Sequence, residues 1–293
     1  LMDTFFVELS TADDVVRFEG EGDLDCLCIA KGSIEGWWST PTPKVTVTSR
    51  GQGDGGHDIA EEDISYASRT VTLHWNANAS DRQSLLALTN RVRQLAHRHV
   101  RMRVVDGGED TYCEQGYVSV TQASDYRPGS IADSTITLVF ERPERLSSQP
   151  QRCQLLPSIE SDHVGLSYGD SGKGLAYPLS YGKAAVDARN VCTLTNNGSS
   201  RAYPVFTVQG PWPSGVQLTF PGLGMSLDYA ESVGNVPLVL DSRSRTASIG
   251  GLDVSRNLRQ RGFPTVQPGG SLAVNLQSIG NGYVSVECHD TYM

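Results

Sequence analysis

The chain has 293 residues, 38% of them hydrophobic and 19% charged, a composition that indicates neither a disordered nor a membrane protein. Thirty-three acidic residues against 24 basic residues give a net charge of −9. This balance argues against a nucleic-acid groove, which needs clustered Lys and Arg, and against docking on anionic lipid. No apolar run approaches the roughly 20 residues of a membrane helix, and no secretion signal is recognisable, so no membrane insertion is expected.

The strand signal of the N-terminal half is alternation of apolar and polar residues. A glycine-rich loop, residues 49–58, comes first, and its four glycines allow a wide excursion of the backbone. After it, Val71, Leu73 and Trp75 share one face of a predicted strand. Two further predicted strands place Val100, Met102 and Val104, and then Ile136, Leu138 and Phe140, on one face.

One amphipathic helix is predicted from Asp81 to about His97. Ser80 is the expected N-cap, and Gln83 completes a capping-box pattern. The apolar residues of the helix recur on one stripe, formed by Leu85, Leu88, Val92 and Leu95. A stripe of this kind is expected to pack on a sheet as core.

The composition changes around residues 141–158, where prolines and serines gather without a period. We therefore expect an N-terminal domain over residues 1–145, a linker and irregular segment over 146–190, and a second domain over 191–293. The second domain shows seven short apolar runs separated by Gly, Asn, Pro and Ser, which predict an antiparallel β-sandwich. The runs are 191–196, 204–210, 215–220, 236–241, 245–250, 271–276 and 283–289. The fold class is thus mostly β with one prominent helix.

The cysteines are few and scattered for a disulfide framework, so free and partly buried thiols are expected. They are Cys26, Cys28, Cys113, Cys153, Cys192 and Cys288. The first two are closer together than the ligand pairs of a zinc knuckle. His97 and His99 are expected to stabilise the end of the helix and not to bind a metal. No metal-binding or cofactor-binding residue is therefore predicted.

Residues 169–172, Gly-Asp-Ser-Gly, match the stretch around the nucleophile of chymotrypsin-like proteases. A nucleophilic serine needs a histidine base, and no upstream histidine lies in the alanine-rich stretch typical of that family. We expect no catalytic residue and no enzyme. A protease that uses Ser171, or a wall hydrolase with carboxylates not recognised in the sequence, stays an alternative.

Three tryptophans are candidate contact residues for a partner or a glycan. Trp37, Trp38 and Trp212 are flanked by Gly, Pro or Ser, which suits an exposed aromatic platform. A place in the core is the other interpretation of each, and the sequence leaves the choice open.

Taken in order, these motifs resemble the distal tail protein of long-tailed, non-contractile bacteriophages (siphoviruses), a component of the tail tip or baseplate hub. The N-terminal half has GQGDGGHD, then ISYASRTVTLHWNA, then the helix. The C-terminal half has VCTLTNNGSSRAYPVFTVQGP, then VPLVLDSRSRTASI, then PGGSLAVNL. The resemblance covers nearly the whole chain except about residues 155–188, and it depends on the order and spacing of short motifs.

The resemblance implies a structural virion protein, assembled in the host cytoplasm, that forms a homo-oligomeric ring, usually of six copies, at the distal end of the tail tube. In that family the first domain closes the ring around a channel through which DNA passes without specific binding. The second domain, a galectin-like sandwich, points outward and carries receptor-binding or fibre proteins, which gives a role in host attachment. Other implied partners are the tail tube protein and the tail-tip hub.

Two further interpretations remain open at this point. The C-terminal sandwich would make the chain a carbohydrate-binding protein for adhesion to the host cell wall, with Trp212 as its platform. A tail-tube subunit would share the architecture of the first domain, although the second domain is large for a decoration.

Overall fold

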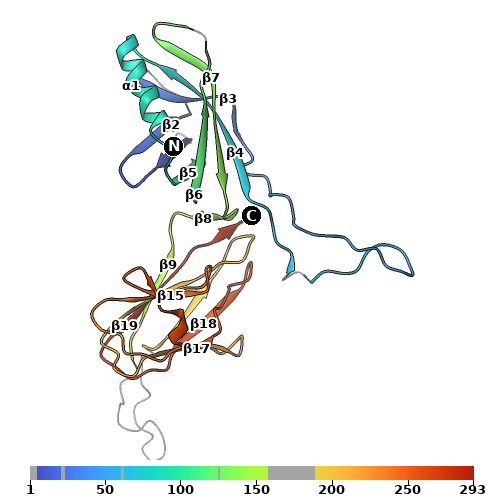
Figure 1. Ribbon diagram of the computed structural model, residues 1–293, viewed down its shortest axis with the longest axis vertical. Coiled ribbons are helices and arrows are strands. Elements are labelled where there is room, and N and C mark those ends of the chain that lie inside the picture. Colours follow the sequence, from blue (N-terminus) through green and yellow to red (C-terminus); the bar gives the residue numbers. More distant parts are fainter. Residues whose placement is uncertain (1–4, 21–23, 61–62, 125, 158–188) are drawn as a thin grey trace, which may run out of the picture. The chain divides into compact units, whose positions relative to one another are not determined.

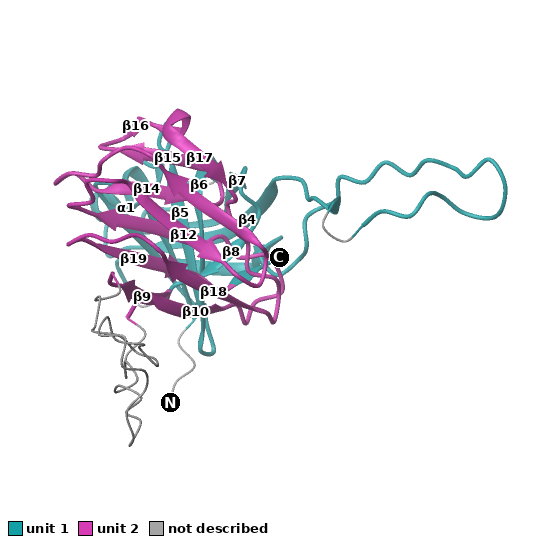
Figure 2. Cartoon of the chain, turned by 90° about the horizontal axis from the view of Figure 1, so that it is seen from below, with its two compact units in different colours: residues 1–149, 291–293 teal, residues 150–290 magenta. Residues whose placement is uncertain are grey.

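The computed structural model describes residues 5–20, 24–60, 63–124, 126–157 and 189–293. The chain forms two compact units, residues 1–149 with 291–293 (unit 1) and residues 150–290 (unit 2), coloured separately in Figure 2. The first boundary lies four residues after the expected end of the N-terminal domain, and the last three residues return to unit 1. The fold class is confirmed: the described residues are mostly strands, with one α-helix.

Unit 1 is built on a closed ring of seven strands (Figure 1). In spatial order they are β6 (Glu109–Thr121), β5 (Val100–Asp106), β1 (Phe6–Ser10), β2 (Val15–Glu19), β3 (Cys26–Glu35), β4 (Arg69–Asn78) and β7 (Ser130–Phe140). The ring closes because β6 pairs with β5 through its first half and with β7 through its second half. The short strands β8 (Arg145–Ser147) and β20 (Thr291–Tyr292) extend the sheet from β6.

The predicted alternation of the unit 1 strands is confirmed. Val71, Leu73 and Trp75 are fully buried, and so are the apolar residues predicted for β5 and β7 apart from 2% exposure at Val104. Phe18 meets Trp75 edge to face, with ring centroids 6.0 Å apart. Apolar side chains therefore fill the interior of the ring, as close packing requires.

The helix is shorter than predicted, and its N-cap is a different residue. It is α1 (Arg82–Arg93), capped by Asp81, whose carboxylate accepts a hydrogen bond from the Ser84 amide at 2.7 Å. Ser80 is not the cap, because its amide and hydroxyl both donate to the Asp25 carboxylate. The helix gives way to tighter turns after Gln94, and His97 adopts a φ of +61°, which ends it.

Unit 2 is an antiparallel sandwich, as predicted, and all seven predicted strands form. One sheet has the order β16 (Leu252–Asp253), β15 (Thr246–Ile249), β14 (Leu238–Asp241), β11 (Val205–Gln209), β19 (Tyr283–Cys288) and β9 (Gln151–Leu155). The other has the order β10 (Val191–Thr195), β18 (Ser271–Leu276), β12 (Val216–Phe220), β13 (Met225–Tyr229) and β17 (Leu258–Arg261). A 3-10 turn (Ser255–Asn257) precedes β17. Both sheets contribute to one buried core around Phe206, Phe220 and Trp212.

Part of the segment expected to be irregular is a strand. β9 lies within residues 146–190 and pairs with β19 along its whole length, from Gln151 opposite Cys288 to Leu155 opposite Val284. In its sequence, QRCQL, only Cys153 and Leu155 are apolar, and an alternation of two residues is too short to predict a strand. The remainder of the expected irregular segment, residues 158–188, lies outside the described residues.

The prediction that all the cysteines are free thiols is wrong for one pair. Cys153 of β9 and Cys192 of β10 form a disulfide. These strands are edges of the two different sheets, so the disulfide links the sheets at one side of the sandwich. Gln151 reinforces the same side, because its side chain hydrogen-bonds the backbone of Thr193 and Thr195.

Candidate interaction surfaces

The residues considered for chemistry do not assemble into a reaction centre within the described part of the chain. Ser171 lies outside the described residues. His74 reaches Glu35 at 3.2 Å, whereas His97 and His99 are exposed beyond the end of α1. No group of three or more His, Cys, Asp or Glu in the described ranges is placed to hold a metal ion. No helix among these residues has the length and apolarity needed to cross a membrane.

Three of the free cysteines, Cys28, Cys113 and Cys288, are buried and poor nucleophiles. Burial raises the pKa of the Cys28, Cys113 and Cys288 thiols to about 12, so they stay protonated near neutral pH. Cys26 is half-buried, with its sulfur 2.8 Å from that of Cys28. Nucleophilic or thiolate chemistry is therefore not favoured at these three buried positions.

The three tryptophans separate into two classes. Trp37 and Trp212 are buried in the cores of unit 1 and unit 2, with 1% and 0% of their surface exposed. The Trp212 indole nitrogen donates to the Gln209 carbonyl at 2.9 Å, which satisfies its one polar atom. For these two the interpretation as core residues holds. Trp38, 46% exposed, keeps its place as a candidate contact residue.

A long arm, residues 40–68, leaves the strands of unit 1 between β3 and β4 (Figure 1, blue to cyan). Residues 61 and 62 within it are not described. Its two sides are joined by sparse backbone contacts, such as those from Lys44 to Ser65 and from His57 to Thr48. The predicted glycine-rich loop forms its apex. The two sides form isolated β-bridges, such as Pro43 with Tyr66 and Ser49 with Gly56, and a hairpin of this kind has no second layer on which to bury side chains.

The arm exposes apolar side chains that a free ribbon cannot cover. Val45, Val47 and Ile59 are all exposed. Five acidic and two basic residues also lie in the arm, so it has a net charge of −3. Exposed apolar side chains gathered on a projecting segment are typical of a surface that meets another chain.

One buried arginine holds the root of the arm. Arg69, the first residue of β4 and 1% exposed, donates from Nη1 to the carbonyl oxygens of Gly36, Trp37 and Ser39 at 2.7–2.9 Å. Its Nε donates to the Pro143 carbonyl at 2.7 Å. Burial lowers the pKa of Arg69 below its usual value, although a guanidinium remains charged in proteins. The side chain thus ties the outgoing end of the arm to the strand on which the arm returns.

The charge of the chain is concentrated in unit 1. Residues 1–149 contain 23 acidic and 14 basic residues, so their net charge is −9, the same as that of the whole chain. Residues 150–290 contain ten of each and are neutral. The total charge of the sequence does not reveal this asymmetry, because it depends on where the boundary between the units lies.

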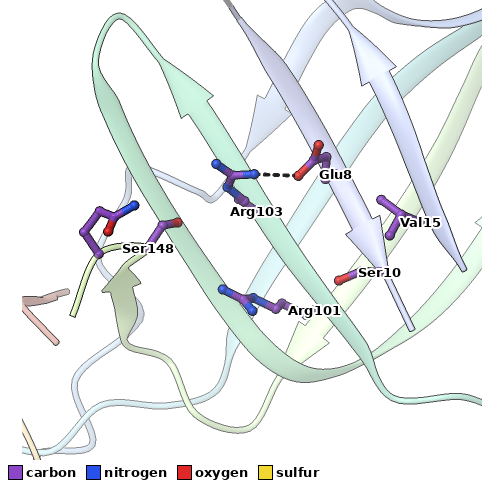
Figure 3. Close-up of a pocket in the computed structure, with 7 residues that line it drawn as sticks. Glu8, Ser10, Val15, Arg101, Arg103 and Ser148 are labelled. Atoms are coloured by element: carbon purple, nitrogen blue, oxygen red, sulfur yellow. Dashed lines mark hydrogen bonds and ion pairs between the residues drawn. The ribbon is translucent and has the colours of Figure 1, made fainter. Parts of the chain in front are cut away.

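An ordered set of charged side chains crosses the outer face of β2, β1, β5 and β6. Arg103 donates to Glu8 at 2.9 Å (Figure 3). It also donates to both carboxylate oxygens of Asp110, at 2.7 and 2.8 Å. Arg17 lies 3.7 Å from Glu8 and 2.7 Å from Glu19. The Arg103 hydrogen bonds hold the pKa of Asp110 below its usual value. These pairs follow the cross-strand register, in which Arg17, Glu8 and Arg103 lie opposite one another.

A cavity of about 280 Å³ opens beside this set. It is lined by Glu8, Ser10, Val15, Arg101, Arg103, Ser148 and Gln149 (Figure 3). The guanidinium of Arg101 stacks over the Tyr112 ring at 3.6 Å. Among the described residues no carboxylate forms an ion pair with Arg101, in contrast to Arg103. The positive charge of Arg101 nevertheless helps to lower the pKa of Asp110, and the carboxylate of Glu8 lines the same cavity.

No protein-family model and no curated sequence matches this chain. Its fold is similar to that of the Dit protein of phage SPP1, described as a paradigm of the hub adsorption apparatus in phages that infect Gram-positive bacteria. That match has a TM-score of 0.59 at 8% identity and covers 98% of this chain and 99% of that one. The phage P2 baseplate in its activated conformation contains a similar chain, with TM-scores of 0.56 in the calcium form and 0.55 in the strontium form. Both matches have 10% identity and cover 98% of each chain. The resemblance to tail-tip proteins is thus confirmed for the fold, over the whole length.

Proposed function

We propose that this chain is a structural, non-enzymatic phage tail protein. Copies of it form a ring at the distal end of a siphovirus tail tube, and the resemblance implies six copies in each ring. The ring joins the tube to tail-tip and receptor-binding proteins and leaves a channel for DNA. The observation that carries the proposal is the similarity in fold to hub and baseplate proteins, which covers 98% of the chain.

The charge distribution supports unit 1 as the part that surrounds the channel. A basic lumen would trap the phosphate backbone of DNA, whereas a surface of the same sign repels it. Unit 1 holds the whole excess of negative charge, and unit 2 is neutral. In the proposed ring, unit 2 lies outside and carries partner proteins.

The arm supports closure of the ring between copies. Each contact in a ring is heterologous, so every copy must present two unlike surfaces that fit each other. The arm supplies one such surface, since its exposed valines and isoleucine need a covering that its own two sides do not provide. The first strands and the outer face of unit 1 are candidates for the second surface of the contact.

The alternative of carbohydrate binding through unit 2 loses its proposed platform, because Trp212 is buried. We retain the galectin-like form of the sandwich as a proposal about its fold and not about sugar binding, since a fold does not imply a function. Trp38, the exposed tryptophan, belongs to unit 1.

The test is the assembly state of the purified full chain, measured by light scattering over a concentration series and by negative-stain imaging. We expect rings with an open centre, formed alone or after addition of the tube protein. A chain that remains monomeric both alone and with tube and tip proteins would refute the ring. Retention of duplex DNA by the rings at physiological salt would contradict the proposed channel.

A further inference from the structure

We propose that Cys26 and Cys28 form a redox site, a dithiol that a small disulfide oxidant converts reversibly into a Cys26–Cys28 disulfide. The two residues lie at the start of β3, and their sulfurs are 2.8 Å apart. The site belongs to the fold of unit 1, so it does not depend on the proposed ring.

The strand places both sulfurs on one of its faces. Residues two apart in a strand point to the same side, and Cys26 and Cys28 lie opposite Asn78 and Asn76 of β4. Leu27, between them, points to the other side and belongs to the core of unit 1. The two sulfurs are therefore adjacent in the reduced fold, and a disulfide needs them to approach only to about 2.05 Å.

The other cysteines are not placed for this reaction. Cys113 and Cys288 donate to the carbonyl oxygens of Glu144 and His289, at 3.4 and 4.0 Å, instead of contacting a second sulfur. Cys153 and Cys192 are already joined. Cys26 and Cys28 are thus the two free thiols that the fold brings together.

The two thiols differ in accessibility, which sets the order of the steps. Cys26 is half-buried and Cys28 is buried, so a small disulfide from solvent reacts with Cys26. The Cys26 thiolate attacks one sulfur of the oxidant, forms a mixed disulfide and releases one half of the oxidant as a thiol. Cys28 then loses its proton, attacks the Cys26 sulfur and releases the other half as a second thiol. Two protein thiols are oxidised to one disulfide while the oxidant is reduced to two thiols, so atoms and electrons balance.

The closeness of the two sulfurs offsets the burial of Cys28 in the second step. Burial, followed by the hydrogen bond and the charge of Cys26, raises the pKa of Cys28 to about 12. The last two causes end when Cys26 is a mixed disulfide, because its sulfur then carries neither a proton nor a charge. The attack is also intramolecular, and groups held in contact react as if at very high concentration. Cys28 is therefore a poor nucleophile toward molecules in solvent and an adequate one toward Cys26.

The strand also makes the bond easy to reverse. Two residues of a strand span about 6.6 Å, near the upper end of the range of about 4.4–6.8 Å between the Cα atoms of a disulfide. A bond closed across this span is strained, and strained disulfides are reduced readily. We therefore expect the state of the pair to follow the balance of thiol and disulfide around the protein.

Glutathione tests the closure in the full chain. Oxidised glutathione is added to the folded wild type, acid stops the reaction, and the remaining thiols are alkylated after unfolding. Trypsin then releases residues 18–31, which contain Cys26 and Cys28 and no other cysteine. We expect this peptide to lose two hydrogens and the count of free thiols to fall from four to two, with both changes reversed by reduced glutathione. Cys113 and Cys288 are internal controls and should remain thiols.

Single variants separate the two steps. Cys28→Ser is expected to stop at the mixed disulfide, with one glutathione on Cys26, whereas Cys26→Ser should leave Cys28 unmodified. Cys113→Ser, which removes a buried thiol of the same unit, is the matched control and should close the pair like the wild type. A wild-type chain that keeps glutathione on Cys26 while Cys28 remains a thiol would overturn the proposed site. So would a peptide 18–31 that stays reduced, or oxidation of Cys113 or Cys288 ahead of it.

Discussion

The Nη1 atom of Arg69 donates to the carbonyl oxygen of Trp37 at 2.8 Å, deep in unit 1. Trp37 is fixed by its buried ring, and Arg69 is fixed by its place at the start of β4. The contact joins the two points at which the arm leaves and re-enters the barrel. The backbone hydrogen bonds found within the described part of the arm join its own two sides, and Arg69 anchors the arm to unit 1 at its root.

Arg69→Met is expected to destabilise unit 1 by about 3 kcal/mol or more. The substitution leaves four carbonyl oxygens without their donor in a buried site, and breaking a buried charged network costs this much. The loss of stability caused by Arg69→Lys should lie between zero and that of Arg69→Met, because an ammonium keeps the charge but lacks the planar fork that reaches several carbonyls. Urea unfolding measures the change. Arg98→Met, which removes an exposed ion pair with Asp13, is the control and should cost under about 1 kcal/mol.

The second prediction concerns pH. Hydrogen bonds from Arg103 and then Ser148 hold the pKa of Asp110 below its usual value in the folded state. As pH falls, the Asp110 carboxylate is therefore protonated in the unfolded chain before it is protonated in the folded chain. The stability that Asp110 contributes to the folded state is present above about pH 4 and is lost as the pH falls below it. Asp110→Asn is expected to lower the urea midpoint near neutral pH and to make the acid side of the stability curve shallower. An equal loss of stability at acid pH in the variant and the wild type would contradict this prediction. Asp133→Asn, at an exposed position of β7, is the matched control.

The third prediction concerns the disulfide of unit 2. Thiol titration of the unfolded, unreduced chain should find four thiols, those of Cys26, Cys28, Cys113 and Cys288. Replacing Cys153 and Cys192 together by Ser is expected to lower the stability of unit 2 by about 2–4 kcal/mol, because the link closes a long loop in the unfolded chain. Thermal unfolding measures this loss. A titre of six thiols would show that Cys153 and Cys192 are reduced and would contradict the prediction. Cys26→Ser, which changes a cysteine outside unit 2, is the control for the stability measurement.

Much of the fold was predictable because apolar alternation is strong where a strand has one buried face. Val71, Leu73 and Trp75 illustrate this, since each is fully buried and the residues between them are not. β9 escaped prediction because the pairing that makes it a strand comes from β19, more than a hundred residues later. The Cys153–Cys192 link depends on the same long-range placement, and spacing along the chain does not reveal it.

The details of the helix and of the surfaces were less accessible for similar reasons. Ser80 and Asp81 are both good N-caps by type, and the choice between them depends on Asp25, which engages Ser80. The two buried tryptophans have flanking Gly, Pro and Ser that are typical of turns, so local composition gave no sign of their burial. The cavity beside Arg101 combines residues of β1, β5 and the end of unit 1, which only the folded register brings together.

The last prediction separates the roles of two tryptophans. Trp212 fills the core of unit 2 beneath Gly280 and Gly282, where any added Cβ would collide with its ring. Trp212→Ala is therefore expected to destabilise unit 2 by about 3–5 kcal/mol, through the lost burial and the cavity that remains. Trp38→Ala, at an exposed position, is expected to change stability by less than about 0.5 kcal/mol. Thermal unfolding measures both. If Trp38 is a partner contact, its substitution weakens binding to tail proteins without a shift in unfolding. A Trp212→Ala variant that unfolds at the wild-type temperature would contradict the role of the Trp212 ring in the core of unit 2.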